Sequence, residues 1–98
     1  MPVPKLTSAE IADALRALPD WSVEAEKLHR EYRFASFAQA IRFMANAVMG
    51  IEKMNHHPEW FNVYNRVRVD LITHDSGGIT RKDVELARML DTVAGEIE

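Results

Sequence analysis

The sequence predicts an α+β protein in which a four-stranded, mostly antiparallel sheet carries three helices on one face. Three observations support this fold class. Capping-box patterns begin at Thr7 and at Thr80, near the two ends of the chain. A long segment from about residue 37 to about residue 55 has apolar residues at helical spacing, and a pair of alternating segments lies on either side of it. The predicted order is helix, strand, strand, helix, strand, strand, helix.

The first helix is predicted by the run Thr7-Ser8-Ala9-Glu10, in which Thr7 caps the helix and Glu10 reaches back to it. The apolar residues that follow at helical spacing are Ile11, Ala14, Leu15 and Leu18. Pro19-Asp20 ends this helix.

Trp21–Val23 and Leu28–Phe34 read as two strands joined by the charged turn Glu24–Lys27. One face of the second strand contains Leu28, Arg30, Tyr32 and Phe34, and the other contains His29, Glu31 and Arg33. Arg30 therefore interrupts a face that is otherwise apolar.

The longest helix is predicted from about Phe37 to about Asn55, with Ser36 as its cap and the His57-Pro58 bond ending it. Its predicted apolar stripe consists of Phe37, Ile41, Met44, Val48 and Ile51. Small residues that allow close approach are Ala40, Ala45 and Ala47.

The second pair of strands is predicted at Trp60–Tyr64 and Val67–Thr73, around a turn near Asn65-Arg66. One face of the last strand has Val67, Val69, Leu71 and Thr73, and the other has Arg68, Asp70, Ile72 and His74. A turn over residues 74–78 leads to the capping box from Thr80 to Asp83. The closing helix then places on one face Val84, Leu86, Ala87, Leu90 and Val93.

Length and composition restrict the possible functions. The 98 residues allow one domain, 1–98, whose thin core makes self-association plausible. The net charge is −3 without a basic stripe, which argues against direct binding of nucleic acid. Cysteine is absent, so disulfides and thiolate chemistry are excluded. Neither an apolar leader nor an apolar run of membrane-spanning length occurs, so no membrane association is expected and the cytoplasm is the default location.

Three of the four histidines lie at predicted element ends, where a rigid scaffold presents side chains to a ligand. His56 and His57 follow the long helix, and His74 follows the last strand. Glu52 precedes His56 by four residues, so the spacing predicts that its carboxylate orients the His56 imidazole. Imidazole is the side chain best suited to give and take protons near neutral pH.

Simpler interpretations of these residues remain open. Histidines at a helix C-terminus are favoured by the helix dipole without any catalytic role. Three histidines could also bind zinc, although adjacent histidines rarely chelate one ion. Asp83 can be a helix cap, a catalytic acid or both. The residue pattern alone therefore supports a histidine-lined pocket and no particular reaction.

A longer pattern resembles a known family. The run Glu52-Lys53-Met54-Asn55-His56-His57-Pro58-Glu59-Trp60-Phe61-Asn62-Val63-Tyr64-Asn65 is followed by Thr73-His74, Gly78-Ile79-Thr80 and Asp83. This succession resembles the signature of the pterin-4a-carbinolamine dehydratase family. The likeness extends over nearly the whole chain, because the opening helix with Trp21, the run Tyr32-Arg33-Phe34, Phe37 and the segment from Ala40 to Met44 also follow the family's layout.

The resemblance implies site residues. The histidines that it implies to be catalytic are His56, His57 and His74. The substrate-binding positions that it implies are Asn55, His56, His57, Ile72, Thr73, His74 and Asp75. Supporting residues are Glu52, Trp60 and Asp83. The chain departs from the family pattern at Asn55, where the family often has an aspartate, at Asp75, where an acidic residue varies, and at Lys82, where an arginine can occur.

The implied activity is dehydration of a 4a-hydroxytetrahydropterin to a quinonoid dihydropterin, which recycles the pterin cofactor of aromatic amino-acid hydroxylases. We expect His56 and His74 to transfer the protons and His57 to bind and polarise the hydroxyl group. This chemistry requires no metal, flavin or nicotinamide, and the sequence has no glycine-rich nucleotide loop.

The resemblance also implies partners: a small-molecule pterin and further copies of the chain in a homodimer or homotetramer. Two other functions stay open. Animal members of the family also act as a dimerisation cofactor, and hence a transcriptional coactivator, for a homeodomain protein, for which helix-face association is the physical route. The domain could also bind pterins without converting them.

Overall fold

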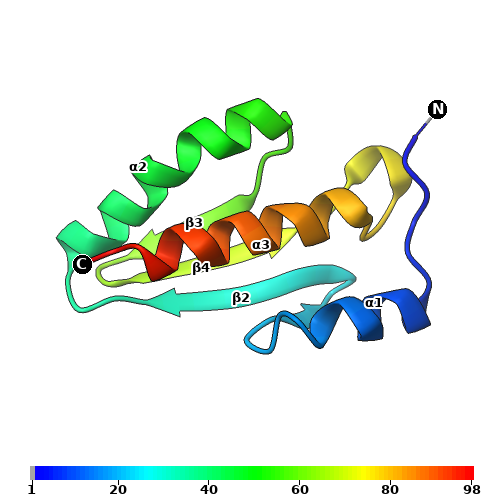
Figure 1. The fold of residues 1–98 in the computed structure, drawn as a ribbon, viewed down its shortest axis with the longest axis horizontal. Coiled ribbons are helices and arrows are strands. Elements are labelled where there is room, and N and C mark those ends of the chain that lie inside the picture. Colours follow the sequence, from blue (N-terminus) through cyan, green and yellow to red (C-terminus); the bar gives the residue numbers. More distant parts are fainter. Residues whose placement is uncertain (1) are drawn as a thin grey trace.

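The computed structural model describes residues 2–98 and has the predicted order of elements (Figure 1). These elements are α1 (Ser8–Leu15), β1 (Ser22–Glu24), β2 (Lys27–Arg33), α2 (Phe37–Met54), β3 (Glu59–Val63), β4 (Arg66–Leu71), the short 3₁₀ helix η1 (His74–Ser76) and α3 (Arg81–Gly95). The predicted caps Thr7, Ser36 and Thr80 each accept a backbone hydrogen bond, and the boxes at Thr7 and Thr80 are complete. The α+β fold class is therefore confirmed.

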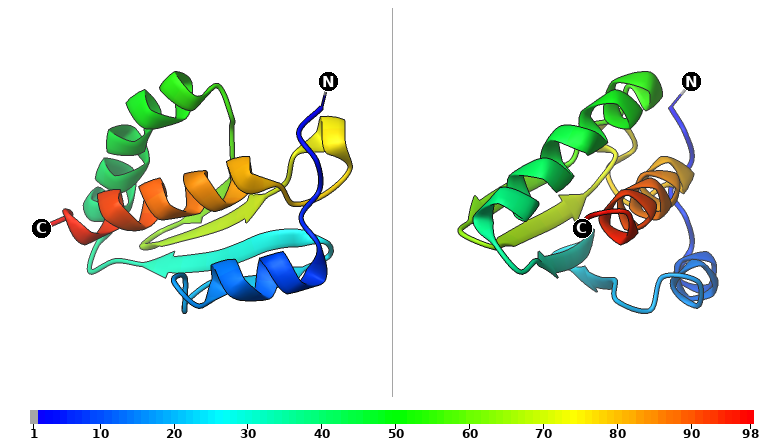
Figure 2. Two further views of the ribbon diagram at one scale, coloured as in Figure 1. Left: turned by 45° about the vertical axis from the view of Figure 1, so that its right-hand side comes forward. Right: turned by 60° about the vertical axis from the view of Figure 1, so that its left-hand side comes forward.

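The four strands form one sheet in the order β1-β2-β4-β3, and every neighbouring pair is antiparallel. Ala25 and Glu26 connect β1 to β2, and both have positive φ angles. A two-residue turn of this kind matches the right-handed twist of the two strands. The three helices lie on the same face of the sheet in all views (Figures 1 and 2).

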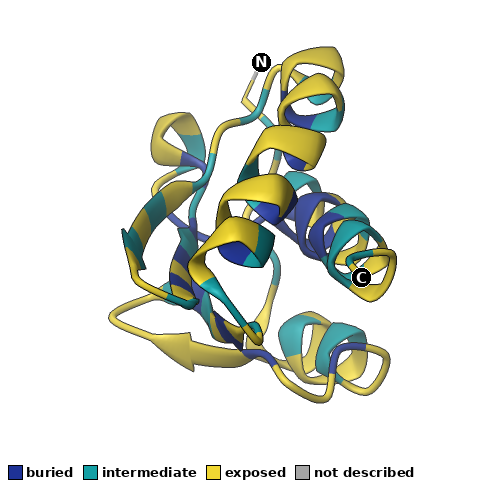
Figure 3. Cartoon of the chain, turned by 90° about the vertical axis from the view of Figure 1, so that its left-hand side faces the viewer, coloured by how far each residue is buried: buried dark blue, intermediate teal, exposed yellow. Residues whose placement is uncertain are grey.

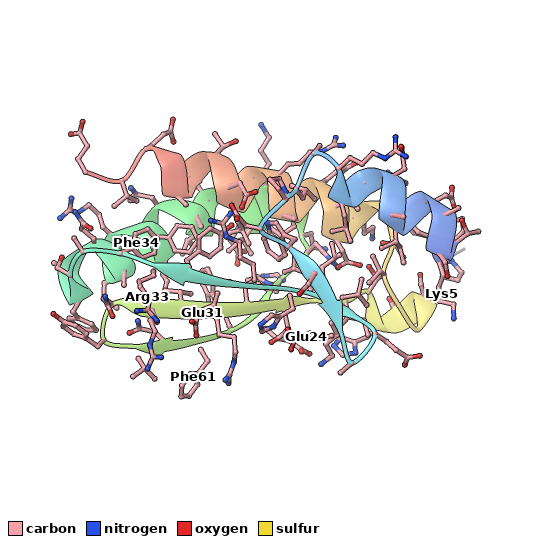
Figure 4. All side chains as sticks on the ribbon, turned by 90° about the horizontal axis from the view of Figure 1, so that it is seen from below. Lys5, Glu24, Glu31, Arg33, Phe34 and Phe61 are labelled. Carbon is pink, nitrogen blue, oxygen red and sulfur yellow. The ribbon has the colours of Figure 1, made fainter. Side chains whose placement is uncertain are left out.

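The core lies between the sheet and the helices, where buried residues face one another (Figure 3). The alternation predicted for the last strand is confirmed, since Val67, Val69 and Leu71 are buried and Arg66 and Arg68 are exposed. From α3, the core receives Val84, Leu86, Ala87 and Leu90. Within residues 2–98 the other face of the sheet carries no helix, and side chains such as those of Glu31, Arg33 and Phe61 project from it (Figure 4).

The predicted apolar stripe of α2 is wrong in part. The buried residues of this helix are Ala40, Phe43, Ala47 and Ile51, whereas Phe37, Ile41 and Val48 are between 41% and 49% exposed. The helix is thus turned about its axis relative to the prediction. Alanines on the inner side let the helix approach the layer beneath it, and Phe43 packs against the rings of Tyr32, Phe34 and Trp60.

Arg30, which interrupts the apolar face of β2, is compensated by Asp91 on α3. One carboxylate oxygen, Oδ1, accepts hydrogen bonds from Arg30 Nη1 at 2.7 Å, from Trp21 Nε1 at 3.0 Å and from the Tyr32 hydroxyl. The Arg30 guanidinium also lies 4.0 Å from the centre of the Tyr32 ring. Burial, together with the hydrogen bond to Asp91, raises the pKa of the Tyr32 hydroxyl, so this group remains a donor.

We expect Asp91→Asn to lower the free energy of unfolding by about 1–3 kcal/mol, because the guanidinium loses the nearer of its two carboxylate partners, keeping Asp20 at 3.6 Å, and the amide cannot satisfy all three donors. Chemical denaturation measures this change. Asp13→Asn, at an exposed position of α1, is the control and should change stability by less than about 0.5 kcal/mol. Equal stabilities for the two variants would contradict the role given to Asp91.

Candidate active site

The ends of α2, β4 and α3 converge on a cavity of about 330 Å³. Such a volume is within the range of small-molecule sites. The lining residues are Asn55, His56, His57, Ile72, Thr73, His74, Asp75 and Lys82. All three histidines of the predicted site, and every predicted substrate-binding position, therefore border the same cavity.

Asn55 sets the direction in which the chain leaves α2. The helix ends at Met54, and Asn55 takes the left-handed conformation with φ 50° and ψ 43°. Asparagine tolerates this conformation better than most residues, and it commonly ends helices in this way. The backbone N–H groups of Asn55 and His56 then bond to the carbonyls of Glu52 and Ile51. The helix thus stops before the His57-Pro58 bond that was predicted to end it.

Because His56 lies beyond the helix, the predicted pairing of Glu52 with His56 is wrong. Oε1 of Glu52 instead lies 3.1 Å from Nε2 of His57. The spacing of four residues indicates a shared helix face only while both residues are helical. Because Asn55 is left-handed, the chain leaves the helix before His56. His57 therefore contacts Glu52, and His56 contacts Asp83 instead.

His56 is held by Asp83, the third residue of α3. Its Nε2 atom lies 2.6 Å from Oδ1 of Asp83, and the Asp83 side chain is completely buried. The second carboxylate oxygen, Oδ2, accepts hydrogen bonds from Thr73 Oγ1 at 2.9 Å and from the Thr80 backbone N–H at 2.8 Å. Asp83 therefore both caps α3 and orients an imidazole.

Two threonine hydroxyls complete this buried network. Thr73 gives its one hydroxyl hydrogen to Asp83, so the 2.7 Å contact between Thr73 Oγ1 and Thr80 Oγ1 must be donated by Thr80. Thr80 Oγ1 in turn accepts from the Lys82 backbone N–H at 3.2 Å. Each polar atom of this group thus has a partner, as burial demands.

The three histidines share one pattern, in which Nε2 contacts a carboxylate from a different element. His56 pairs with Asp83 of α3, His57 with Glu52 of α2, and His74 with Glu59 of β3 at 3.0 Å. An ionised carboxylate only accepts hydrogen bonds, so Nε2 carries the proton in each ring. An imidazole with its proton on Nε2 has a lone pair on Nδ1 while it is neutral, and this atom can act as a base.

Glu59 is bound on both of its oxygens. Oε2 contacts His74, and Oε1 lies 2.5 Å from Nζ of Lys27 at the start of β2. The hydrogen bond from Lys27, followed by that from His74, lowers the pKa of the Glu59 carboxyl group below its ordinary value of 4.5. The same hydrogen bond raises the pKa of the Lys27 ammonium group. Both groups therefore stay ionised near neutral pH.

The remaining predicted residues fall in two places. Ile72, Thr73 and Asp75 border the cavity, as does Asn55. Trp60, predicted as a supporting residue, packs on the inner face of the sheet with its ring centre 6.4 Å from that of Phe43, and it is not part of the cavity wall.

Sequence reasoning missed the contacts of Glu59 with His74, 15 residues away, and of Glu52 with His57. The two missed partnerships with the longest separations are those of Asp83 with His56 and of Glu59 with Lys27. The partners are 27 and 32 residues apart. Spacing along the chain gives no signal for contacts at such separations.

Residues 2–98 contain neither a candidate metal-binding cluster nor a helix that could span a membrane. No group of three or more His, Asp or Glu side chains there is arranged to hold a metal ion. No helix in that range is long and apolar enough to cross a membrane.

Comparison with known sequences identifies relatives. Residues 4–93 match the sequence profile of the family described as pterin 4 alpha carbinolamine dehydratase. A protein of Solibacter usitatus is 58% identical over 90 residues, covering 92% of this chain and 95% of its own length. A protein of Burkholderia multivorans is 50% identical, covering 94% and 92% of the two chains. Both carry provisional names as pterin-4-alpha-carbinolamine dehydratases.

Two solved structures are similar to this fold. A transcriptional coactivator/pterin dehydratase from Brucella melitensis is 45% identical, with a TM-score of 0.89 over 93% of this chain and 99% of its own. A pterin dehydratase-like protein described as a RuBisCO assembly factor of the alpha-carboxysome is 21% identical, with a TM-score of 0.63 over 76% and 87% of the two chains. The second likeness shows the fold alone.

The paired Glu59 carboxyl group leads to a test by NMR titration. In the wild type its pKa should lie below 4.5, and Lys27→Met should move it upward toward that value. Because the folded-state pKa is the lower one, the stabilisation is present above the unfolded-state pKa and is lost as the pH falls through the folded-state value. Glu31, exposed on the same sheet face, is the control whose titration Lys27→Met should not alter. An unchanged Glu59 titration would contradict the pairing.

Proposed function

The chain belongs to the pterin-4a-carbinolamine dehydratase family, and we propose that it removes water from a 4a-hydroxytetrahydropterin to give a quinonoid dihydropterin. The observation that supports this activity best is the cavity bordered by three imidazoles, each bonded through Nε2 to its own carboxylate. A pterin binder without activity has no need for three oriented proton-transfer groups. In cells, the reaction would recycle the pterin cofactor of aromatic amino-acid hydroxylases.

The proposed reaction requires two proton transfers. A protonated imidazole gives its proton to the hydroxyl group on C4a, the C4a–O bond breaks with its electron pair on oxygen, and water leaves. A neutral imidazole removes the proton from the neighbouring ring nitrogen, N5, and the electrons of that N–H bond form the C4a–N5 double bond. One imidazole loses a proton and another gains one, so proton exchange with solvent restores the starting state.

We assign the two transfers to His56 and His74 and the binding of the hydroxyl group to His57. The spacing of Glu52 no longer supports this assignment, because Glu52 contacts His57. The support comes instead from the carboxylates that hold the rings of His56 and His74. Asp83 and Glu59 each stabilise the imidazolium that forms when the paired ring takes up a proton. His56 follows α2 and His74 begins η1, so the two rings can approach a planar ring from different directions.

The rest of the cavity wall suits a heterocycle with several polar edges. The Asn55 amide both donates and accepts, the Asp75 carboxylate accepts, and the Lys82 ammonium group donates. The aliphatic side chain of Ile72 offers an apolar contact for the ring face. Asn55 in place of the aspartate expected in the family gives the cavity one less negative charge and an additional donor.

The decisive assay is the rate of quinonoid dihydropterin formation from the carbinolamine with and without the protein. His56→Ala and His74→Ala should each lower kcat by about 10²–10⁴-fold, the usual contribution of a general acid or base. His57→Ala should have a smaller effect on kcat and raise KM. His29→Ala is the matched control, since His29 contacts Asp70 on the open face of the sheet.

Two results would contradict this assignment. If His57→Ala lost most turnover while the other two variants stayed near the wild type, the division of roles would be wrong. If the wild-type protein did not accelerate the reaction at all, the dehydratase function would be wrong, and pterin binding without turnover would remain. Repeating the wild-type assay with a chelator tests whether turnover depends on a metal ion.

A second proposal is that copies of the chain associate through the outer face of α2. This face exposes the large apolar side chains of Phe37, Ile41 and Val48, which are between 41% and 49% exposed, and Met49, 79% exposed, lies about 80–120° further round the helix. Contiguous apolar residues on a small protein commonly mark a contact surface. The same face would also serve a protein-interaction role in this chain, as a transcriptional coactivator needs, and the similar structure from Brucella melitensis is named a transcriptional coactivator/pterin dehydratase.

Size-exclusion chromatography with light scattering tests this second proposal. The wild type should elute as an oligomer, and Ile41→Glu should shift it toward the monomer because a charge would be buried in the contact. Asn46→Glu, which places the same charge at an exposed position elsewhere on α2, should leave the oligomer intact. A monomeric wild type at micromolar concentration would refute association through this face.

A further inference from the structure

His74 borders the cavity, but the short helix that carries it does little to fix the position of its side chain. It is the first residue of η1, which has only three residues, and its side chain is 72% exposed. Backbone hydrogen bonds from Ser76 to Thr73 and from Gly77 to His74 fix the turn itself. They do not fix the orientation of the imidazole ring. An exposed side chain on so short a turn would otherwise populate several rotamers.

The hydrogen bond that does orient the ring is the one to Glu59, which begins β3. The two groups are 15 residues apart in sequence, and the distance from Nε2 to Oε2 is 3.0 Å. Glu59 lies directly opposite Asp70 of β4 in the antiparallel register. Two like charges in such a pair repel one another, so Glu59 needs a compensating cation to keep its place.

Lys27 supplies that cation from the other side of β4. In the register, its neighbour Leu28 pairs with Leu71, so Lys27 stands at the same end of the sheet as Glu59. Its ammonium group contacts Oε1 at 2.5 Å, which leaves Oε2 for His74. The ammonium group also interacts favourably with the charge of Asp70. Lys27, Glu59 and His74 thus form a continuous chain from β2 to the cavity.

We propose that Glu59 and Lys27 are positioning residues for His74, with Glu59 fixing the rotamer and the Nε2–H tautomer of the ring and Lys27 fixing Glu59. The Nδ1 atom of His74 is then the nitrogen left to exchange a proton with the pterin. This inference rests on the proposed dehydratase function and extends its site to two residues of the sheet that do not border the cavity.

The physical setting favours a role in orientation over one in stability. Side chains of Lys27 and Glu59 are 30% and 44% exposed, and ion pairs in such contact with water add little to the free energy of unfolding. Their effect on a reaction can be larger, because a proton transfer depends steeply on the position of the group that carries it.

The first test is Glu59→Gln, combined with Lys27→Met in a double-mutant cycle. The glutamine side chain has one oxygen and cannot accept from both Lys27 and His74. We expect kcat to fall about two- to fivefold with KM and thermal stability nearly unchanged, as a partly solvated hydrogen bond allows. Lys27→Met should lower kcat in the wild-type background and have no further effect in the Glu59→Gln background.

The control for the first test is Glu31→Gln, the same replacement on the same open face of the sheet and away from the cavity. It should leave kcat unchanged. If the effects of Glu59→Gln and Lys27→Met on kcat were additive, Lys27 would not act through Glu59, and that part of the inference would be overturned.

The second test does not depend on turnover. Three-bond NMR couplings report the side-chain rotamer of His74, and long-range ¹⁵N spectra report which ring nitrogen carries the proton. The wild type should show one rotamer and the Nε2–H tautomer, whereas Glu59→Gln should show averaged couplings. Averaged couplings already in the wild type, or identical spectra in the variant, would overturn the inference. A wild type that is inactive but has an ordered His74 would refute only the dehydratase function.

Discussion

The candidate site depends on one buried carboxylate. Asp83 is completely inaccessible to solvent, and a charge in that position is tolerated only when hydrogen-bond donors surround it. Its donors come from the chain after α2, from the chain that follows β4 and from the N-cap residue of α3. Separating any one of these elements from the others would leave a buried charge short of a partner. The requirement to satisfy Asp83 therefore holds together the three element ends that form the cavity, and it fixes the His56 ring among them.

The three histidine–carboxylate pairs differ in their contact with water, and this difference suits the proposed reaction. The His56 side chain is 11% exposed, against 58% for His57 and 72% for His74. Electrostatic interactions are stronger where water is excluded, so the contact with Asp83 is the most rigid of the three. A dehydration also releases water and leaves two side chains in altered protonation states. A group at the rim of the cavity can restore its proton directly from solvent, whereas the His56 ring meets solvent chiefly through the cavity that it borders.

Local signals in the sequence predicted most of the fold, and the errors lie where packing decides. The capping boxes at Thr7 and Thr80 and the alternation of β4 depend on near neighbours, which the sequence displays directly. In α2, by contrast, apolar residues lie on more than one side of the helix. Which side is buried depends on how closely the helix can approach the layer beneath it. Ala40 and Ala47 permit that approach, although large side chains elsewhere on the helix appear more hydrophobic. Periodicity therefore predicted the helix correctly and its buried face incorrectly.

The composition of the site could be predicted from the family pattern, but its pairings could not. A single left-handed residue, Asn55, moves His56 out of reach of Glu52, and only the presence of asparagine at a helix end hints at this change. The Lys27–Glu59 contact depends on strand register, because both side chains project from the open face across β4. A shift of one residue in either pairing would turn one of them to the helical face. Strand register thus controls the orientation of His74 from outside the cavity, which explains why the residues that border a site do not by themselves determine its geometry.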